Sequence, residues 1–398
     1  LILSLLFLGS PAFAEWQQVG MAGFTPGEVQ ELNLALDSGN TPYVAYRDAS
    51  SGYKVSVMKF DGAAWVQVGA EGFTADSVRD VCLALDSGNI PYVAYRDGGN
   101  GSKASVMKFD NGTWQQVGEA GFTSGYADSI SLAFDSSNIP YVAYNGHNGD
   151  DGSYNPYKAS VMKFDGAEWV QVGTAGFSAG LAHYLSLAFD SGDTPYVAYN
   201  AYTASMTDPR ITAMKFDGSE WVLVGQARFT AGSAGWLNLV FDNGDTPYIA
   251  YADGGSERKA SVMKFDGAEW VQVGTAGFTA GAVYYTSLAF DSGSTPYVAY
   301  SDVDNGYKPC VIKFDGSAWM QVGAAGFTAD YAVYTSLAFD SDDTPYVAYL
   351  DGGNGRKASV MKFVVDADGD PVQLRAMEVN QSVQAWDNSV PLITNKPT

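Results

Sequence analysis

Short runs of alternating apolar and polar residues recur along this chain at a nearly constant interval. Each unit is marked by a tryptophan, and these tryptophans are Trp16, Trp65, Trp114, Trp169, Trp221, Trp270 and Trp319. Successive tryptophans are 49, 49, 55, 52, 49 and 49 residues apart. No apolar period of 3.6 residues persists through a unit, so the pattern predicts repeated β-strands rather than helices.

Each unit contains four strand-like segments separated by turn sequences. In the first unit we expect strands at residues 32–37, 42–46, 54–60 and 65–69, because β-branched and aromatic residues dominate there. Pro42 stands at the start of a strand, where its missing N–H does least harm. Repeats of about 40 to 50 residues with four strands are typical of β-propeller blades.

A repeated aspartate after the first strand of each unit gives the number of copies. It occurs as Asp37, Asp86, Asp135, Asp190, Asp242, Asp291 and Asp340. The last copy supplies three strands, while an unpaired strand, residues 16–20, precedes the first copy. We therefore predict an all-β, seven-bladed propeller over residues 15–363, with four antiparallel strands per blade. The N-terminal strand completes the last blade and removes its exposed edge. A linear solenoid is the alternative, but its terminal repeats should resemble caps.

The N-terminal segment differs from the repeats. Residues 1–8 are apolar, and the sequence Ala12-Phe13-Ala14 has the small-residue pattern of a cleavage site. This predicts a secretory signal peptide over residues 1–14, truncated at its start, and therefore a secreted or cell-surface protein. The apolar run is too short to cross a bilayer, and no other segment reaches the required length of about 20 residues.

The repeat also stops before the C-terminal segment, residues 364–398, which we predict to be a linker or the start of a further extracellular domain. Asp366, Asp368 and Asp370 have the spacing of a calcium loop. However, Pro371 replaces the glycine that an EF-hand requires, and Met377 replaces its bidentate glutamate. A solvated acidic linker without a cofactor is the preferred interpretation, and a calcium site is the alternative.

Composition narrows the classes of partner. The 398 residues carry a formal net charge of −22, and 46% are hydrophobic. Binding to nucleic acid depends on clustered lysine and arginine. The negative net charge therefore argues against binding to nucleic acid or to anionic membranes. The two cysteines, Cys82 and Cys310, stand where sibling blades have serine. We expect two unpaired, buried thiols.

The turn Asp37-Ser-Gly-Asn-Thr41 resembles the Asp-box of sialidase-like propellers, and residues 34–46 resemble NHL-type blades. The resemblance covers nearly all of residues 16–363 and implies the propeller fold of secreted bacterial-type repeat proteins. Ala35 and Pro42 depart from the Asp-box pattern, and the arginine triad and Tyr/Glu pair of sialidases have no match here. The resemblance therefore implies a fold and no active site. The aspartate is interpreted as a cap on its own turn.

One position that varies between copies carries candidate chemistry. It stands six residues before the repeated aspartate, where a loop between blades enters the first strand near the central channel. Around the ring it is occupied by Glu31, Asp80, Ser129, Tyr184, Trp236, Tyr285 and Tyr334. We expect it on the face that carries the varying loops, opposite the face of constant turns. One side of the channel mouth would be acidic and the other aromatic.

The residue after the second strand varies as well. It is Arg47, Arg96, Asn145, Asn200, Ala252, Ser301 and Leu350 in the seven copies, and nearby loop residues add Tyr126, His183, Tyr284 and Tyr331. The predicted ligand-binding residues are Glu31, Arg47, Asp80, Arg96, His183, Tyr184, Trp236, Tyr285 and Tyr334. The alternative is that the charged residues pair locally and the tyrosines pack between blades.

The sequence contains few motifs that are typical of catalytic sites. The histidines, His147 and His183, form no H-x-x-x-H zinc pattern, and no G-x-S-x-G elbow occurs. No catalytic or metal residue is predicted, and the sequence favours a binding protein over an enzyme. The third copy has an insertion of six residues within 146–157, with Asn148, Asp150 and Asp151. It is interpreted as a surface loop, with a partner loop or a calcium site as alternatives.

Flat aromatic faces beside acids and arginines suit a sugar ring, whose C–H face stacks and whose hydroxyls form hydrogen bonds. They also suit a protein partner. We therefore predict a secreted recognition or adhesion module, a monomeric propeller within a longer chain, that binds a glycan or an extracellular protein. A glycan-active hydrolase or lyase with carboxylates at the channel mouth is the first alternative. A structural spacer of a larger surface protein is the second.

Overall fold

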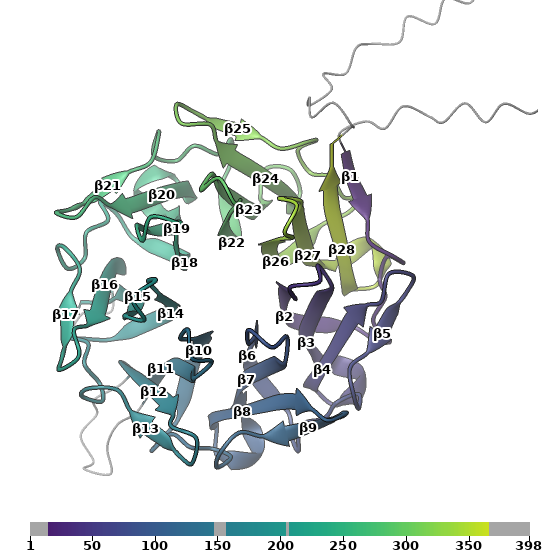
Figure 1. The fold of residues 1–398 in the computed structure, drawn as a ribbon. Coiled ribbons are helices and arrows are strands. Elements are labelled where there is room, and N and C mark those ends of the chain that lie inside the picture. Colours follow the sequence, from purple (N-terminus) through teal and green to yellow (C-terminus); the bar gives the residue numbers. More distant parts are fainter. Residues whose placement is uncertain (1–14, 147–156, 204–206, 366–398) are drawn as a thin grey trace, which may run out of the picture. The chain divides into compact units, whose positions relative to one another are not determined.

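A computed structural model describes residues 15–146, 157–203 and 207–365. In that part of the chain, 28 strands form seven four-stranded antiparallel sheets around a central channel (Figure 1). The predicted all-β seven-bladed propeller is confirmed, and the solenoid is excluded because the ring is closed. No helix in the described part is long and apolar enough to span a bilayer.

In blades one to six the four strands lie in chain order from the channel outward, and in blade seven β1 takes the outermost place. The innermost strands are β2 (Val29–Leu36), β6 (Val78–Leu85), β10 (Ala127–Phe134), β14 (Ala182–Phe189), β18 (Ala234–Phe241), β22 (Val283–Phe290) and β26 (Ala332–Phe339). The second strands are β3 (Pro42–Asp48), β7 (Pro91–Asp97), β11 (Pro140–Gly146), β15 (Pro195–Ala201), β19 (Pro247–Asp253), β23 (Pro296–Asp302) and β27 (Pro345–Asp351).

The remaining strands complete the blades. The third strands are β4 (Lys54–Phe60), β8 (Lys103–Asp110), β12 (Lys158–Phe164), β16 (Arg210–Phe216), β20 (Lys259–Phe265), β24 (Lys308–Phe314) and β28 (Lys357–Val364). The outermost are β5 (Trp65–Gln67), β9 (Thr113–Gln116), β13 (Trp169–Gln171), β17 (Trp221–Leu223), β21 (Trp270–Gln272), β25 (Trp319–Gln321) and, for blade seven, β1 (Glu15–Gln18). Four short 3-10 helices follow second strands: η1 (Ala49–Ser51), η2 (Gly98–Asn100), η3 (Gly254–Ser256) and η4 (Gly352–Asn354).

The N-terminal strand closes the ring as predicted. Strand β1 pairs antiparallel with β28, with Trp16 opposite Phe363 and Gln18 opposite Met361. Blade seven is therefore built from both ends of the described chain, and no outer edge of β28 is left unpaired. Figure 1 shows β1, in purple, beside the yellow β28.

The repeated tryptophans hold each blade to its neighbour. The indole of Trp65 donates a 2.7 Å hydrogen bond to the carbonyl of Val19 and stacks on Phe24 at 3.9 Å between ring centroids. Trp16 makes the same contacts across the closure, with the carbonyl of Val322 at 3.0 Å and the Phe327 ring at 4.3 Å. Because the indole N–H finds a partner, these large rings are buried without an unpaired donor.

A second ring of hydrogen bonds links the inner strands. In each blade, the side chain four residues before the repeated aspartate accepts a hydrogen bond from a leucine N–H of the next blade. Ser131 Oγ, for example, accepts from the Leu187 N–H at 3.0 Å. The ring closes through Ser336 and Leu34. Cys82 takes the serine role with its Sγ, 3.4 Å from the Leu132 nitrogen. Both cysteines are unpaired; Cys310 is buried, whereas Cys82 is only partly buried, because it lies on a channel-lining strand.

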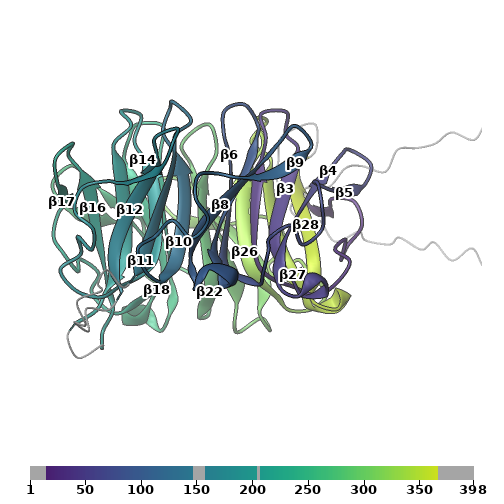
Figure 2. The ribbon, with the colours of Figure 1, turned by 90° about the horizontal axis from the view of Figure 1, so that it is seen from below.

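The two faces of the ring have different connections, as Figure 2 shows from the side. The repeated aspartates cap the constant turns: Asp37 Oδ1 accepts from the N–H groups of Gly39 and Thr41 at 2.9 and 2.8 Å, which agrees with its interpretation as a turn cap. The 3-10 helices lie on the opposite rim, the lower one in Figure 2. There, buried Asp48 accepts from the Ser50 N–H and the Ser56 hydroxyl, so part of the variable-loop face is scaffold as well.

We predict that ring closure depends on Trp16 as strongly as an internal junction depends on its tryptophan. Replacing a buried tryptophan by alanine removes its packing and leaves a cavity, so Trp16→Ala should lower the free energy of unfolding by about 3 kcal/mol or more. Urea denaturation measures this, with Trp65→Ala as the matched variant at an internal junction. A large loss for Trp65→Ala with under about 1 kcal/mol for Trp16→Ala would mean that β1 is not docked.

Candidate functional site

Each innermost strand contains a β-bulge at the same place. In β2 the register shifts between Gln30 and Asn33, so Glu31 and Leu32 lie opposite the single residue Tyr46. The predicted first strand, 32–37, therefore begins too late: the candidate position lies within the strand and not in a loop. The extra residue of the bulge interrupts the alternation of inward and outward side chains. Because strands are recognised in a sequence by this alternation, the residues before the bulge were not predicted as part of the strand.

The bulge residue has a left-handed backbone in every blade. The values of φ lie between 45° and 57° at Glu31, Asp80, Ser129, Tyr184, Trp236, Tyr285 and Tyr334. Non-glycine residues adopt this conformation uncommonly, and for bulky side chains it is a genuine outlier. All seven positions are non-glycine here, and all seven residues line one cavity of about 580 Å³ in the central channel.

Four aromatic residues form an arc along one wall of this cavity. The Tyr184 and Trp236 ring centroids are 6.3 Å apart, those of Trp236 and Tyr285 5.9 Å, and those of Tyr285 and Tyr334 4.5 Å. Tyr184 is 46% exposed, and the other three are half-buried. Hydroxyls from the next blade hold this backbone in place, because Thr286 donates to the Trp236 carbonyl and Thr335 to that of Tyr285.

Carboxyl groups occupy the other wall. The backbone N–H of Asp80 donates to Glu31 Oε2 at 2.5 Å, which links blades one and two. Asp80 Oδ2 lies 3.7 Å from Arg96 Nε and makes no hydrogen bond. Asp128 Oδ1 lies 3.4 Å from Arg96 Nη1. Burial and, after it, the neighbouring Asp128 carboxylate raise the pKa of the Asp80 carboxyl to about 8, which favours its protonated form.

The two predicted arginines lie outside the set of residues that line the cavity. Arg96 bridges Asp80 and Asp128 and donates to the Tyr126 hydroxyl. Arg47 donates to Gln30 Oε1, and its guanidinium lies 4.3 Å from the centre of the Tyr53 ring. Arg96 therefore supports the polar wall from behind, in the local pairing that the sequence left open as an alternative, whereas Arg47 has no carboxylate within 4.0 Å in the described part of the chain.

His183 also lines the cavity. Its ring centroid lies 5.3 Å from that of Tyr157 and 5.1 Å from that of Tyr202, and its Nδ1 is 3.4 Å from Asn145 Nδ2. Partial burial lowers the pKa of the imidazole, which favours the neutral ring. His183 can therefore exchange a hydrogen bond with a ligand without bringing a positive charge.

Sequence reasoning missed Asp128 and Tyr202, which line the same cavity. Asp128 stands just before the bulge position, where the sibling blades have Gln30, Arg79, His183, Gly235, Tyr284 and Val333. A comparison of that position across the copies would have found it. The insertion residues Asn148, Asp150 and Asp151, and the acidic segment after Val365, lie outside the described residues.

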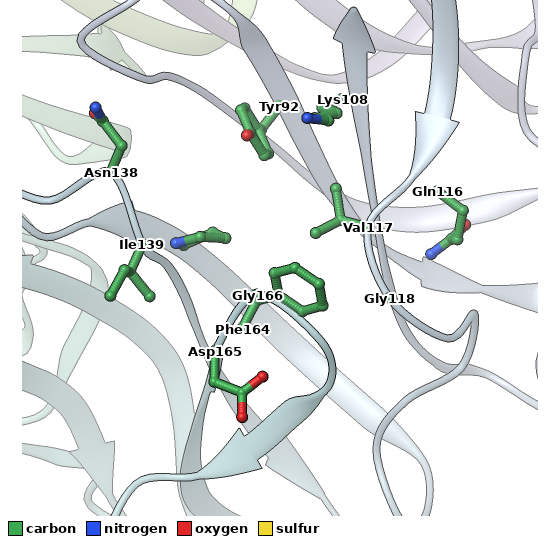
Figure 3. Close-up of a pocket in the computed structure, with 11 residues that line it drawn as sticks. Tyr92, Lys108, Gln116, Val117, Gly118, Asn138, Ile139, Phe164, Asp165 and Gly166 are labelled. Carbon is green, nitrogen blue, oxygen red and sulfur yellow. The ribbon is translucent and has the colours of Figure 1, made fainter.

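A second, smaller cavity of about 270 Å³ lies between blades two and three (Figure 3). Its lining includes Tyr92, Lys108, Val117 and Phe164, each of which has a like residue at the equivalent position of most other blades. A crevice made of repeated scaffold residues carries no specific chemistry. In the described part of the chain, no three His, Cys, Asp or Glu side chains are placed to hold a metal ion.

No family model and no curated protein matches this chain. Solved structures that are similar in fold include the following three. A puromycin-hydrolysing peptidase of Mycobacterium tuberculosis has a TM-score of 0.55 at 9% identity, over 89% of this chain and 56% of its own. The polysaccharide lyase Uly1 has a TM-score of 0.54 at 9% identity, over 86% of this chain and 90% of its own.

The third is an ulvan lyase of polysaccharide lyase family PL25, with a TM-score of 0.52 at 13% identity, over 88% of this chain and 96% of its own. At such low identities the likeness shows the fold alone. The chain thus shares a propeller fold with glycan-active enzymes and a peptidase.

Proposed function

We propose that this protein is a secreted recognition module that binds a carbohydrate in the central cavity of its variable-loop face. The observation that carries the proposal is that one cavity has two chemically different walls. The aromatic wall consists of Tyr184, Trp236, Tyr285 and Tyr334, and the carboxyl wall consists of Glu31, Asp80 and Asp128. Its volume of about 580 Å³ falls in the range of ligand sites, roughly 300 to 1,000 Å³.

The aromatic wall suits the apolar face of a sugar. A pyranose presents axial C–H groups on its faces, and these pack against a π-surface such as that of Trp236. Neighbouring ring centroids are 4.5 to 6.3 Å apart along the arc, so a sugar can contact more than one ring. An aromatic surface that curves around a channel favours a ligand of several sugar units.

The carboxyl wall suits the hydroxyl groups. Ionised carboxylates accept hydrogen bonds only, whereas a protonated carboxyl both donates and accepts. With its pKa raised to about 8, Asp80 can be protonated and supply a donor to this wall. Arg96 holds Asp80 and Asp128 from behind, so this wall is ordered before a ligand arrives. A preorganised polar wall lowers the entropy lost on binding.

A glycan-active hydrolase or lyase is the second candidate. A carboxyl group with a raised pKa beside other carboxyl groups is a frequent feature of acid–base catalysis, and Asp80 meets this description. The fold shared with two polysaccharide lyases adds to this candidate. Turnover of a bound glycan that disappears in Asp80→Asn would establish it. The protein-partner and spacer alternatives require that no glycan binds the cavity.

We predict that Trp236→Ala and Tyr285→Ala each weaken glycan binding about 5- to 30-fold. Each loses one stacking surface, worth about 1 to 2 kcal/mol, and 1.4 kcal/mol corresponds to a factor of ten in affinity. A glycan array of the full chain, followed by titration of the best ligand, measures the effect. Tyr53→Ala is the matched control, because Tyr53 is 41% exposed on the same face and does not line the cavity. Unchanged binding in both cavity variants would move the site elsewhere.

We also predict a pH dependence of stability that comes from Asp80. Its pKa is higher in the folded than in the unfolded chain, so the folded state holds the proton more tightly. The contribution of Asp80 to the free energy of unfolding therefore decreases as pH rises from about 4 to about 8. Urea unfolding at pH 5 and pH 8.5 should show a smaller difference for Asp80→Asn than for the wild type.

The exposed Asp76 in the preceding loop provides the control for this measurement. Asp76→Asn removes the same formal charge without entering the cavity and should leave the wild-type pH difference in place. An Asp80→Asn variant with the same pH difference as Asp76→Asn would show that Asp80 titrates normally.

A further inference from the structure

A guanidinium group lies against two aromatic rings at the edge of the cavity, between blades five and six. The Cζ atom of Arg258 is 4.6 Å from the centre of the Tyr284 ring and 5.2 Å from that of Trp236. The two rings are themselves 4.5 Å apart. Trp236 also lines the cavity, so this cluster is continuous with the aromatic wall.

The backbone of Arg258 is fixed from both sides. Its N–H donates to the Asp253 carbonyl at 2.8 Å, and its carbonyl accepts from the N–H of Val283 at 2.9 Å. The equivalent position with the same backbone bonds carries Tyr53, Ser102, Tyr307 and Arg356 in other blades. The scaffold therefore does not require an arginine here: blades five and seven carry one, and the other three blades carry tyrosine or serine.

The charge of Arg258 has no partner carboxylate. In residues 15–146, 157–203 and 207–365, no Asp or Glu oxygen lies within 4.0 Å of its guanidinium nitrogens. The same holds for Arg47 and Arg79, whereas Arg96, Arg210, Arg228 and Arg356 each have such a partner. A cation–π contact uses the charge of the guanidinium and does not consume its N–H donors, which stay available to a ligand. A planar fork of donors matches the oxygens of an anionic group.

We propose that Arg258, Trp236 and Tyr284 form a second subsite, which binds a carboxylate or sulfate group on one sugar unit of the glycan in the cavity. This inference rests on the proposed function. The cavity lining carries Glu31, Asp80 and Asp128 on blades one to three and no arginine, so an anionic group fits better beside Arg258, on blade five. The ligand is therefore a glycan with both neutral and acidic units, the neutral units facing Glu31, Asp80 and Asp128.

The surface outward from this subsite can hold a further unit. The Tyr307 ring centroid is 5.8 Å from that of Tyr284, and Tyr307 is 41% exposed. The aromatic surface thus continues from the channel through Tyr284 to the rim. The net charge of −22 opposes long-range attraction of an acidic glycan. Screening limits this repulsion to about 8 Å at physiological salt, so the direct contact with Arg258 dominates.

The test is a glycan array probed with the full chain, carrying oligosaccharides of several backbones, each in a neutral, a uronate-bearing and a sulfated form. For the backbone that binds, we expect the wild type to prefer an acidic form at least tenfold over the neutral one. Comparing the binding of the uronate-bearing form with that of the sulfated form shows which anionic group the subsite prefers. Arg258→Gln should lose the preference and bind the acidic and neutral forms within twofold of each other. Arg258→Lys should restore only part of the preference, because it keeps the charge and loses the planar fork.

Arg356→Gln is the matched control, because that guanidinium is already paired with Glu28 at 2.6 Å, and it should leave the preference unchanged. Equal binding of neutral and acidic forms, or an unchanged preference in Arg258→Gln, would overturn this inference and leave the proposed function standing. Binding of no glycan of any form by the wild type would overturn the proposed function itself.

Discussion

The candidate site depends on a backbone constraint repeated in every blade: one residue of each innermost strand is held in the left-handed conformation at a β-bulge. For an L-residue this conformation costs about 1 kcal/mol or more, and seven non-glycine residues adopt it here. The bulge redirects one side chain per blade, and all seven of these residues line the channel cavity. A strained position that recurs and carries different side chains is where function is expected.

The surrounding scaffold offsets this strain through contacts that recur between blades. Indole hydrogen bonds and stacked phenylalanines join the blades in their outer part, and side-chain acceptors for leucine N–H groups join the inner strands. Both sets continue across the junction between blade seven and blade one. Because these contacts do not involve the bulge side chain, that side chain is free to differ between blades. Acids and aromatics can therefore gather on opposite walls of one cavity.

The number of blades, their closure by the N-terminal strand and the turn role of Asp37 were predictable, because the repeat aligns seven copies against one another. The same alignment brought out Glu31, Tyr184 and Trp236 as one varying position. It could not show the bulge, since an extra residue disrupts the alternation from which strands are recognised. Side-chain contacts between different blades could not be predicted from the sequence either. The positions of Arg96 behind the carboxyl wall and of Arg258 against Trp236 became known only from the three-dimensional structure.

The constraint itself is tested most directly at Tyr184, the most exposed aromatic residue of the arc, by comparing Tyr184→Gly with Tyr184→Ala. Both variants lose the ring and differ only in Cβ, so a left-handed backbone predicts a free energy of unfolding about 1 kcal/mol higher for the glycine variant. Leu223, an exposed strand residue outside the left-handed region, provides the control. There the Leu223→Ala variant should be more stable than the Leu223→Gly variant. An alanine variant at least as stable as the glycine variant at position 184 would contradict the account.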